Sequence, residues 1–303
     1  MTPEEETFFR ARLGDARGRV EVALDALLPK ETGAGAQAVL ADAMRHGVLN
    51  GGKRLRAFLT LEIAGLFGAD PAQADRVAAS TECLHAYSLI HDDLPCMDDD
   101  DLRRGQPTVH RKWDEATAVL AGDGLQTIAF EILAAPETHG DGAVRADLIL
   151  SLARNSGFAG MVGGQMLDIA AETAASHDKA EIESIQRLKT GALIVHAAVS
   201  GAILAEASAA DRKAIRDYAC DLGSAYQIAD DILDVTGHVA ETGKAVGKDA
   251  GAGKATFVDL LGLDRAKARA RELVDRACEN LSSFGPEADA LRYVAEYTVS
   301  RRS

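Results

Sequence analysis

Two clusters of aspartate lie far apart in this chain and limit how it can fold. The first cluster falls within residues 92–101 and the second within residues 230–234. Carboxylates at this density repel one another, so a fold that brings them together needs cations between them. Mg²⁺ is the natural candidate, because it commonly bridges a few carboxylates to the phosphate oxygens of a substrate. Arg103 and Arg104 directly follow the first cluster and favour a phosphate as that partner. The clusters therefore predict a Mg²⁺-dependent site for a diphosphate.

The second cluster has the spacing of a helix face. Positions i, i+3, i+4 and i+7 are held by Gln227, Asp230, Asp231 and Asp234. Such positions share one side of an α-helix. A solvated acidic stripe is the alternative, but like charges set side by side without a cation destabilise a helix. We therefore interpret this face as metal-binding.

The first cluster follows a segment with similar spacing, in which His85, Ser88 and Asp92 recur along one face. A calcium-binding EF-hand is the alternative for such a run of aspartates. It is disfavoured because the loop glycine after the third acidic position and the terminal glutamate are both missing. A disordered acidic segment is disfavoured by the residues interleaved with the charges, which are Leu94, Pro95, Met97 and Leu102.

A third segment, residues 51–56, has the sequence Gly-Gly-Lys-Arg-Leu-Arg and lies where a helix is expected to begin. Backbone N–H groups and the helix dipole at such a position add to the side-chain charge, which suits diphosphate oxygens. The glycine spacing and the Ser or Thr of a Walker A loop are missing. Taken alone, a basic helix start is more often a solvated face, so this segment gains meaning from the aspartate clusters.

The rest of the sequence predicts an all-α protein. Of the 303 residues, 47% are hydrophobic and only 5% are aromatic, and no long alternation of β-branched residues occurs. No segment has the composition of a linker, and a chain of this length could form one large domain or two ordinary ones. Two long loops, 94–108 and 236–256, are candidates for function. Helices are expected near residues 4–28, 36–49, 53–67, 72–93, 113–135, 144–156, 158–171, 179–190, 192–206, 211–236, 254–282 and 287–300.

Charge and composition also limit the partners and the compartment. A net charge of -14 disfavours nucleic acid, whose phosphates need broad basic surfaces. The most apolar run, residues 192–205, is too short to cross a bilayer and is expected to be a buried helix. The four cysteines form no CxxC pair, which favours free thiols in the cytosol and leaves disulfides or a zinc site open. With no apolar signal segment near Met1, we expect a soluble cytoplasmic protein without membrane insertion.

Several motifs, taken in order, resemble those of the trans-isoprenyl diphosphate synthases. The likeness runs from about residue 35 to residue 300, and within that family the chain most resembles the bacterial farnesyl diphosphate synthases. The motifs are residues 51–56; Asp92, Asp93 and Asp98 with residues 103–105; Gly164, Gln165 and Asp168; residues 189–191; and Gln227 with Asp230, Asp231 and Asp234.

The resemblance implies a single all-α domain over residues 1–303, an isoprenoid-synthase-type helical bundle around a deep central cavity. It also implies a homodimer, for which the apolar helix of residues 116–133 is our candidate interface. The implied cofactor is Mg²⁺, about three ions per active site with substrate bound, bridging carboxylates to substrate phosphates. The implied ligands are Asp92, Asp98 and Asp230, with Asp93, Asp231 and Asp234 as outer or water-mediated ligands.

The same resemblance implies the substrate-binding residues. Isopentenyl diphosphate would be bound by Lys53, Arg56, His85 and Arg104, and the allylic diphosphate would be contacted by Arg103. The allylic diphosphate and the cation formed from it would be surrounded by the catalytic residues Lys189, Thr190, Gln227 and Lys244, with Lys254 nearby. The segment 236–256 and the C-terminal Arg301 and Arg302 would close over the site.

The implied reaction condenses isopentenyl diphosphate with dimethylallyl or geranyl diphosphate to give farnesyl diphosphate. Chain length would be set beneath the first motif, by Tyr87 and Ser88. Tyr87 lies five residues before Asp92, roughly 7.5 Å away along a helix, where its ring would block a longer product. A geranylgeranyl diphosphate synthase is the nearest alternative. A class I terpene cyclase, a non-catalytic helical subunit and an acidic Ca²⁺-binding module are more distant alternatives.

Overall fold

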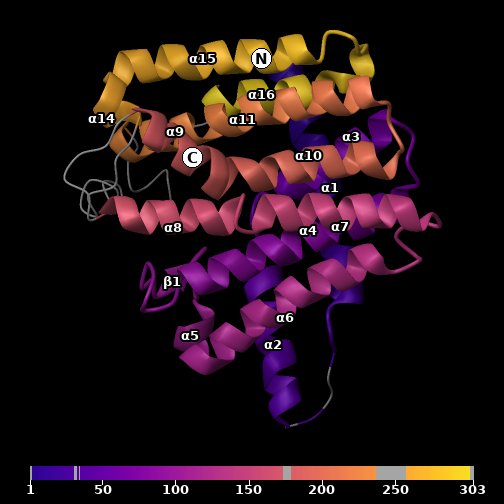
Figure 1. Ribbon diagram of the computed structural model, residues 1–303, viewed down its shortest axis with the longest axis vertical. Helices are drawn as coiled ribbons and strands as arrows, with labels where there is room; N and C mark the ends of the chain where they lie inside the picture. The colour runs from indigo at the N-terminus through magenta and orange to yellow at the C-terminus, as the bar shows by residue number, and fades with distance from the viewer. Residues whose placement is uncertain (1, 31–32, 34, 173–178, 237–256, 301–303) are drawn as a thin grey trace.

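The computed structural model describes residues 2–30, 33, 35–172, 179–236 and 257–300, and helices dominate these ranges (Figure 1). A short antiparallel ribbon pairs β1 (Leu102–Arg103) with β2 (Gln106–Pro107). A π turn, η1 (Arg187–Gly191), joins α9 to α10, and a 3-10 turn, η2 (Pro286–Ala288), precedes α16. The α-helices are α1 (Pro3–Leu27), α2 (Ala36–Leu49), α3 (Leu55–Leu66), α4 (Pro71–Asp92), α5 (Val109–Lys112), α6 (Glu115–Ala134), α7 (Gly142–Ser156), α8 (Met161–Glu172), α9 (Lys179–Gln186), α10 (Ala192–Leu204), α11 (Ala209–Thr236), α14 (Phe257–Leu261), α15 (Leu263–Asn280) and α16 (Asp289–Ser300). The expected all-α class is confirmed.

Several helices begin where the sequence supplies a capping residue. Thr2 and Glu5 form a reciprocal capping box at the start of α1. Asp70 accepts hydrogen bonds from two amides in the first turn of α4. Asp114 and Asp141 cap α6 and α7 in the same way. Local sequence therefore explains where these helices start.

The structure departs from the predicted elements in three places. The helix expected over 254–282, of which 254–256 lie outside the described residues, is divided at Gly262, whose φ of 78° is left-handed. The helices expected over 179–190 and 192–206 are continuous through η1. The loop expected over 94–108 contains the β1–β2 ribbon and is followed by α5. Elements this short have too few residues to show a periodic pattern.

Helix α10 lies at the centre of the molecule, and all of its residues are buried. It packs against α3, α4, α7 and α11 (Figure 1). Gly201 permits the close contact with α3, because a Cβ atom there would lie 2.6 Å from the carbonyl oxygen of Thr60. The buried helix expected from the most apolar run is thus confirmed over Ala192–Leu204. The hydrophobic core around it extends from Phe9 of α1 to Ala295 of α16.

Two helical stretches, Glu115–Ala134 and Ala180–Leu204, have the length and mean hydropathy of a membrane span. In the second, 78% of the apolar window is buried inside the molecule, which its place in the core explains. In Glu115–Ala134, which is α6, only 39% of the apolar window is buried. Helix α6 therefore has an apolar face that the other described helices leave partly exposed. The expectation of no membrane insertion stays a prediction.

All four cysteines are free thiols. Cys83 is buried in α4, where burial raises the pKa of its thiol to about 12, while Cys96 and Cys220 are exposed. The interpretation of the cysteine pattern as free thiols is therefore confirmed.

Candidate active site

The two aspartate clusters lie toward the same end of the bundle. Helix α4 ends at Asp92, and α11 carries the second cluster close to its own end at Thr236. In Figure 1 the end of α11, the β1–β2 ribbon that follows α4, and α9 all lie toward one side of the molecule. The fold thus gives the two acidic helix ends a shared region, as the sequence predicts.

Asp92 lies in surroundings that disfavour its charge. Burial at the end of α4 raises the pKa of its carboxyl group to about 6, and Asp98 and Asp93 reinforce the rise. Lys189 and Arg103 oppose it. Because Lys189 belongs to η1, this interaction shows that η1 and the end of α4 face a common space. A cation bound at Asp92 would stabilise the ionised carboxylate in the same way.

Asp93, by contrast, is paired by the protein itself. Its buried carboxylate accepts two hydrogen bonds from Nε of Arg103, at 2.8 and 2.9 Å, and one from Nη2 at 2.5 Å. The Arg103 guanidinium also lies 3.8 Å from Asp100. The resemblance implies separate roles for Asp93 and Arg103, as an outer metal ligand and a diphosphate contact. Those roles stay predictions, and the structure joins the two residues to each other.

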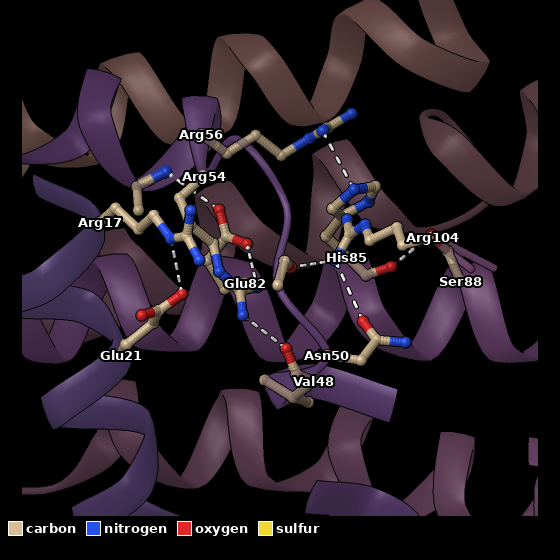
Figure 2. A network of polar contacts seen from close by, with 12 residues as sticks. Arg17, Glu21, Val48, Asn50, Arg54, Arg56, Glu82, His85, Ser88 and Arg104 are labelled. Carbon is tan, nitrogen blue, oxygen red and sulfur yellow. Dashed lines mark hydrogen bonds and ion pairs between the residues drawn. The ribbon is translucent and has the colours of Figure 1, made fainter. Parts of the chain in front are cut away.

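Three of the residues expected to bind the second diphosphate lie close together in Figure 2, namely Arg56 of α3, His85 of α4 and Arg104. Nη1 of Arg56 lies 3.3 Å from Nε2 of His85. Burial lowers the pKa of His85 well below its ordinary value, and the positive charges of Arg56 and Arg104 lower it further. His85 is therefore neutral near pH 7 and adds no charge to the cluster. Lys53 is exposed and lies two residues before the start of α3.

A glycine brings Arg104 into this cluster. Gly52 has a φ of 117°, and a Cβ atom there would lie 2.6 Å from Cζ of Arg104. The Arg104 guanidinium donates hydrogen bonds to the carbonyl oxygen of Gly51 and, at 3.3 Å, to Oδ1 of Asn50. The ribbon that follows the first aspartate cluster is thereby joined to the segment 51–56.

A buried ion pair next to this cluster was missed by the sequence analysis. Nη1 of Arg54 and Oε2 of Glu82 lie 2.9 Å apart, and the two side chains are only 2% and 3% exposed. Arg54 also donates to the carbonyl oxygen of Val48, and Glu82 accepts from the amide nitrogen of Ala57 at 3.1 Å. The pair therefore joins the end of α2, the start of α3 and the middle of α4, and it supports the segment that carries the predicted substrate-binding cations.

Lys189 and Thr190 lie on the π turn η1. Nζ of Lys189 lies 2.5 Å from Oδ2 of Asp168 on α8. Gly164 allows α8 to approach this closely, because a Cβ atom there would lie 2.2 Å from the backbone nitrogen of Lys189. The motifs at 164–168 and 189–191 thus form one structural unit. Single π turns within helices are frequent at functional sites.

The second aspartate cluster contains residues in different surroundings. Asp230 is exposed. Burial lowers the pKa of Arg56, and the negative charge of Asp230 partly offsets this effect. Asp231 is buried, and its carboxylate is an acceptor for donors from three elements. These donors are Nε2 of Gln186 at 3.0 Å, Nε2 of Gln227 at 3.3 Å and the amide nitrogen of Phe257 at 2.9 Å. The predicted roles of Asp231 and Gln227 at the metal and the substrate are untested by these contacts.

The carboxylates fit Mg²⁺ that binds together with a diphosphate. Among the described residues, no three His, Cys, Asp or Glu side chains form a group that could hold a metal ion alone. Mg²⁺, however, is commonly held by one or two carboxylates together with substrate phosphates and water. Asp92 supplies hard oxygen ligands whose negative charge is destabilised by burial and by neighbouring carboxylates, which a cation would relieve.

Some predicted site residues lie outside the part of the chain that the structure describes. They are Lys244, Lys254, Arg301 and Arg302, together with the segment 237–256.

The sequence profile described as polyprenyl synthetase matches residues 37–294. The chain belongs to this family. Farnesyl diphosphate synthase of Escherichia coli (strain K12) is 47% identical over 266 residues, which cover 86% of this chain and 88% of the relative. The chloroplastic geranylgeranyl pyrophosphate synthase 3 of Arabidopsis thaliana is 42% identical over 273 residues, covering 86% of this chain and 74% of that relative.

Solved structures match nearly the whole chain. An FPP/GFPP synthase from Zymomonas mobilis has a TM-score of 0.87 and 44% identity, covering 97% of this chain and 99% of its own. A geranyltransferase from Helicobacter pylori, complexed with magnesium and isoprenyl diphosphate, has a TM-score of 0.81 and 32% identity, covering 99% and 98%. The isoprenoid-synthase-type fold expected from the resemblance is confirmed.

We expect Glu82→Gln to destabilise the fold strongly, because it leaves the Arg54 guanidinium buried without a counter-charge. Breaking a buried ion pair in this way lowers the free energy of unfolding by about 3–5 kcal/mol. Glu21→Gln is the matched control, since Glu21 lies 3.0 Å from Arg17 in an exposed pair (Figure 2) and its loss changes stability by about 0.5 kcal/mol or less. Urea unfolding measures both, and equal effects would contradict a structural role for the Arg54–Glu82 pair.

Proposed function

We propose that this protein is a farnesyl diphosphate synthase. In this reaction isopentenyl diphosphate condenses with dimethylallyl diphosphate and then with geranyl diphosphate, and each step releases diphosphate. The observation that carries the proposal is the division of charge at one end of the bundle. A site around Asp92 has more carboxylates than cations, while a neighbouring site built from Arg56, Arg104 and neutral His85 is cationic. The identity of 47% to a farnesyl diphosphate synthase supports the same function.

The two sites treat their diphosphates differently. On the cationic side, Arg56 and Arg104 with the nearby Lys53 bind a diphosphate directly, through charge-assisted hydrogen bonds. Neutral His85 orients the Arg56 guanidinium without adding charge. On the acidic side, Asp92, Asp98 and Asp230 would hold Mg²⁺, with Asp93, Asp231 and Asp234 in outer positions. Magnesium bound there would stabilise the negative charge of the departing diphosphate.

This division determines which ester is ionised. The allylic diphosphate on the acidic side leaves, and Lys189 and Thr190 on η1 together with Gln227 on α11 line the space around the allylic cation. The double bond of isopentenyl diphosphate attacks that cation, a new carbon–carbon bond forms, and a proton is lost to the released diphosphate. Arg103 and Lys244 would contact the allylic diphosphate, with Lys254 nearby. Water must be excluded while the cation exists, since it would convert the cation to an alcohol.

We further propose that residues 1–303 form one polyprenyl synthetase domain in the cytoplasm. One continuous hydrophobic core that includes Phe9 and Ala295 supports the single domain. The net charge of -14 supports small diphosphates rather than nucleic acid as partners.

The function is tested by the release of diphosphate and by the length of the product. We expect release only when Mg²⁺, an allylic diphosphate and isopentenyl diphosphate are all present, and a fifteen-carbon alcohol after dephosphorylation. Asp92→Asn should reduce the rate by about 100-fold or more, because charge stabilisation at the leaving group is lost. Enzymatic phosphate detection and chromatography give the readouts. Release from the allylic substrate alone would favour a terpene cyclase, and no release would favour a non-catalytic subunit.

Tyr87 is placed to limit the product. Its ring packs edge-on against His91, with ring centroids 5.0 Å apart. His91 in turn contacts the carbonyl oxygen of Val119 at 3.1 Å, in a space that Gly122 of α6 leaves open. The negative charge of Asp92 contributes to raising the pKa of the Tyr87 hydroxyl, after burial, which supports a position close to the first motif. The Tyr87 ring is thus packed on His91 of its own helix, and His91 in turn contacts α6.

Tyr87→Ala should lengthen the product from fifteen to about twenty carbons, because the ring no longer blocks the growing tail. Tyr87→Phe keeps the ring and should still give farnesyl diphosphate, which makes it the matched control. Chromatography of dephosphorylated products made from labelled isopentenyl diphosphate distinguishes the two. The alternative of a geranylgeranyl diphosphate synthase would be established by a twenty-carbon product from the unmodified protein. Ser88 is a weaker candidate for this role, since its hydroxyl is bonded to the carbonyl oxygen of His85 at 2.9 Å.

A homodimer would cover the apolar side chains that the bundle leaves exposed. On α6, which contains the candidate interface helix of residues 116–133, these include Leu120, which is 55% exposed. On and just before α8 they include Met166 at 65% and Phe158 at 95%. Apolar exposure on this scale is typical of an interaction surface.

Leu120→Asp and Met166→Asp should each shift the protein toward the monomer, because a carboxylate cannot be buried unpaired at an apolar interface. Val22→Asp is the control, since Val22 on α1 is also exposed and lies on neither helix. Sedimentation velocity at micromolar concentration measures the effect against a chain mass of 31.9 kDa. A monomeric unmodified protein would contradict the proposed dimer.

A further inference from the structure

Gln186 is the last residue of α9, and the π turn η1 begins directly after it. Its Nε2 atom donates a hydrogen bond of 3.0 Å to Oδ2 of Asp231 on α11. Gln186 belongs to none of the motifs that the sequence analysis used. Its other polar atom, Oε1, is buried without a hydrogen-bond partner among the described residues. The amide nitrogen of Gln186 therefore faces the Asp231 carboxylate, which can only accept hydrogen bonds. The amide oxygen is the end that lacks a partner.

The π turn that follows Gln186 is held closely on two sides. Toward α8, Gly164 allows contact with the backbone of Lys189, and Asp168 bonds to the Lys189 ammonium group. Toward α11, a Cβ atom on Gly223 would lie 3.2 Å from Cα of Gly191. Backbone contacts as close as these set the distance between helices, but they do not by themselves set the rotation of a turn about its axis. A directional bond at the start of the turn can do so.

Asp231 connects the start of the π turn to two further elements. The same carboxylate accepts hydrogen bonds from Gln227 within α11 and from the amide nitrogen of Phe257, the first residue of α14. Without the Gln186 hydrogen bond, Asp231 would still accept from Gln227 and Phe257, so a change at Gln186 is expected to act on the turn that carries Lys189 and Thr190.

We propose that Gln186 is a positioning residue for the prenyl transfer reaction. Its hydrogen bond to Asp231 aligns the π turn with α11, so that Lys189 and Thr190 face the allylic diphosphate in the correct orientation. This inference rests on the proposed function. It also assigns Asp231 a role as an acceptor for protein donors, which is distinct from the binding of magnesium.

Gln186→Met tests the inference, because methionine has a similar length and lacks the amide donor. We expect kcat to fall by about 10- to 100-fold, since small misplacements of catalytic groups have effects of this size. The KM for isopentenyl diphosphate should change by less than about twofold, because the cationic site lies on α3 and α4. The Mg²⁺ concentration for half-maximal activity should also stay unchanged. Gln37→Met, at an exposed position on α2, is the matched control and should leave all three values unchanged.

An exchange of donor and acceptor provides a second test. Gln186→Glu should lower kcat because it sets two carboxylates against each other, and Asp231→Asn should lower it because an acceptor is lost. In the double variant Gln186→Glu with Asp231→Asn, the amide of residue 231 can donate to the carboxylate of residue 186. We expect the double variant to recover at least tenfold in kcat over Gln186→Glu, which a double-mutant cycle measures.

The outcomes separate the inference from its alternatives. An unchanged kcat in Gln186→Met would overturn it, as would a rise in the Mg²⁺ requirement of that variant, which indicates a direct effect on the metal site. A fall in activity that matches the loss of folded protein, measured by circular dichroism in the assay buffer, would also overturn it. Inactivity of the unmodified protein with both substrates and Mg²⁺ would instead contradict the proposed function.

Discussion

Asp92 ends helix α4 in surroundings that raise the pKa of its carboxyl group to about 6, and the candidate site depends on this burial of charge. The carboxylates of Asp98 and Asp93 raise this pKa further. Around His85, by contrast, the neighbouring charges are the positive ones of Arg56 and Arg104. The protein thus keeps opposite charges in separate places, although they lie at one end of one bundle. Of two diphosphate esters, one would find a direct cationic site on one side and the other a place that requires metal. Under the proposed function, selectivity for the ester that ionises would follow from this separation.

Two glycines allow close contacts that fix the position of the cationic site and of the π turn. Gly52 allows the guanidinium of Arg104 to pack on the segment before α3, and Gly164 allows α8 to contact the π turn. A side chain at either position would collide with the group that the site positions there. The buried Arg54–Glu82 pair holds the start of α3 against α4 from the interior. The charged groups at the surface of the site are therefore carried by a framework with little freedom to move, which electrostatic catalysis requires.

Much of the site could be predicted from the sequence because its residues follow a helical period. His85 and Asp92 on α4, and Gln227, Asp230 and Asp231 on α11, lie where their spacing predicted. Their surroundings could not be predicted in the same way. Asp92 and Asp93 are neighbours in the sequence, yet Asp93 is paired with Arg103, while burial raises the pKa of Asp92 and the positive charge of Lys189 on η1 partly offsets that rise. Adjacent positions on a helix differ by about 100° in direction, so they meet different parts of the fold.

The contacts missed from the sequence join residues that no local pattern connects. Arg54 and Glu82 are 28 residues apart and belong to different helices, and Gln186 and Asp231 are 45 residues apart. The π turn at Lys189 was also absent from the predictions, since a helix with one additional residue in a turn retains a nearly regular apolar pattern.

The sequence alone determined the helical class, the capped starts of several helices and the chemical types of the site, because these follow from local propensity and from a 3.6-residue period. Only the tertiary structure decided which carboxylate is paired with Arg103, that burial lowers the pKa of His85, and how the π turn meets α11. These properties depend on burial and on partners from other helices. Both are set by how the helices pack, and packing joins positions that lie far apart along the chain.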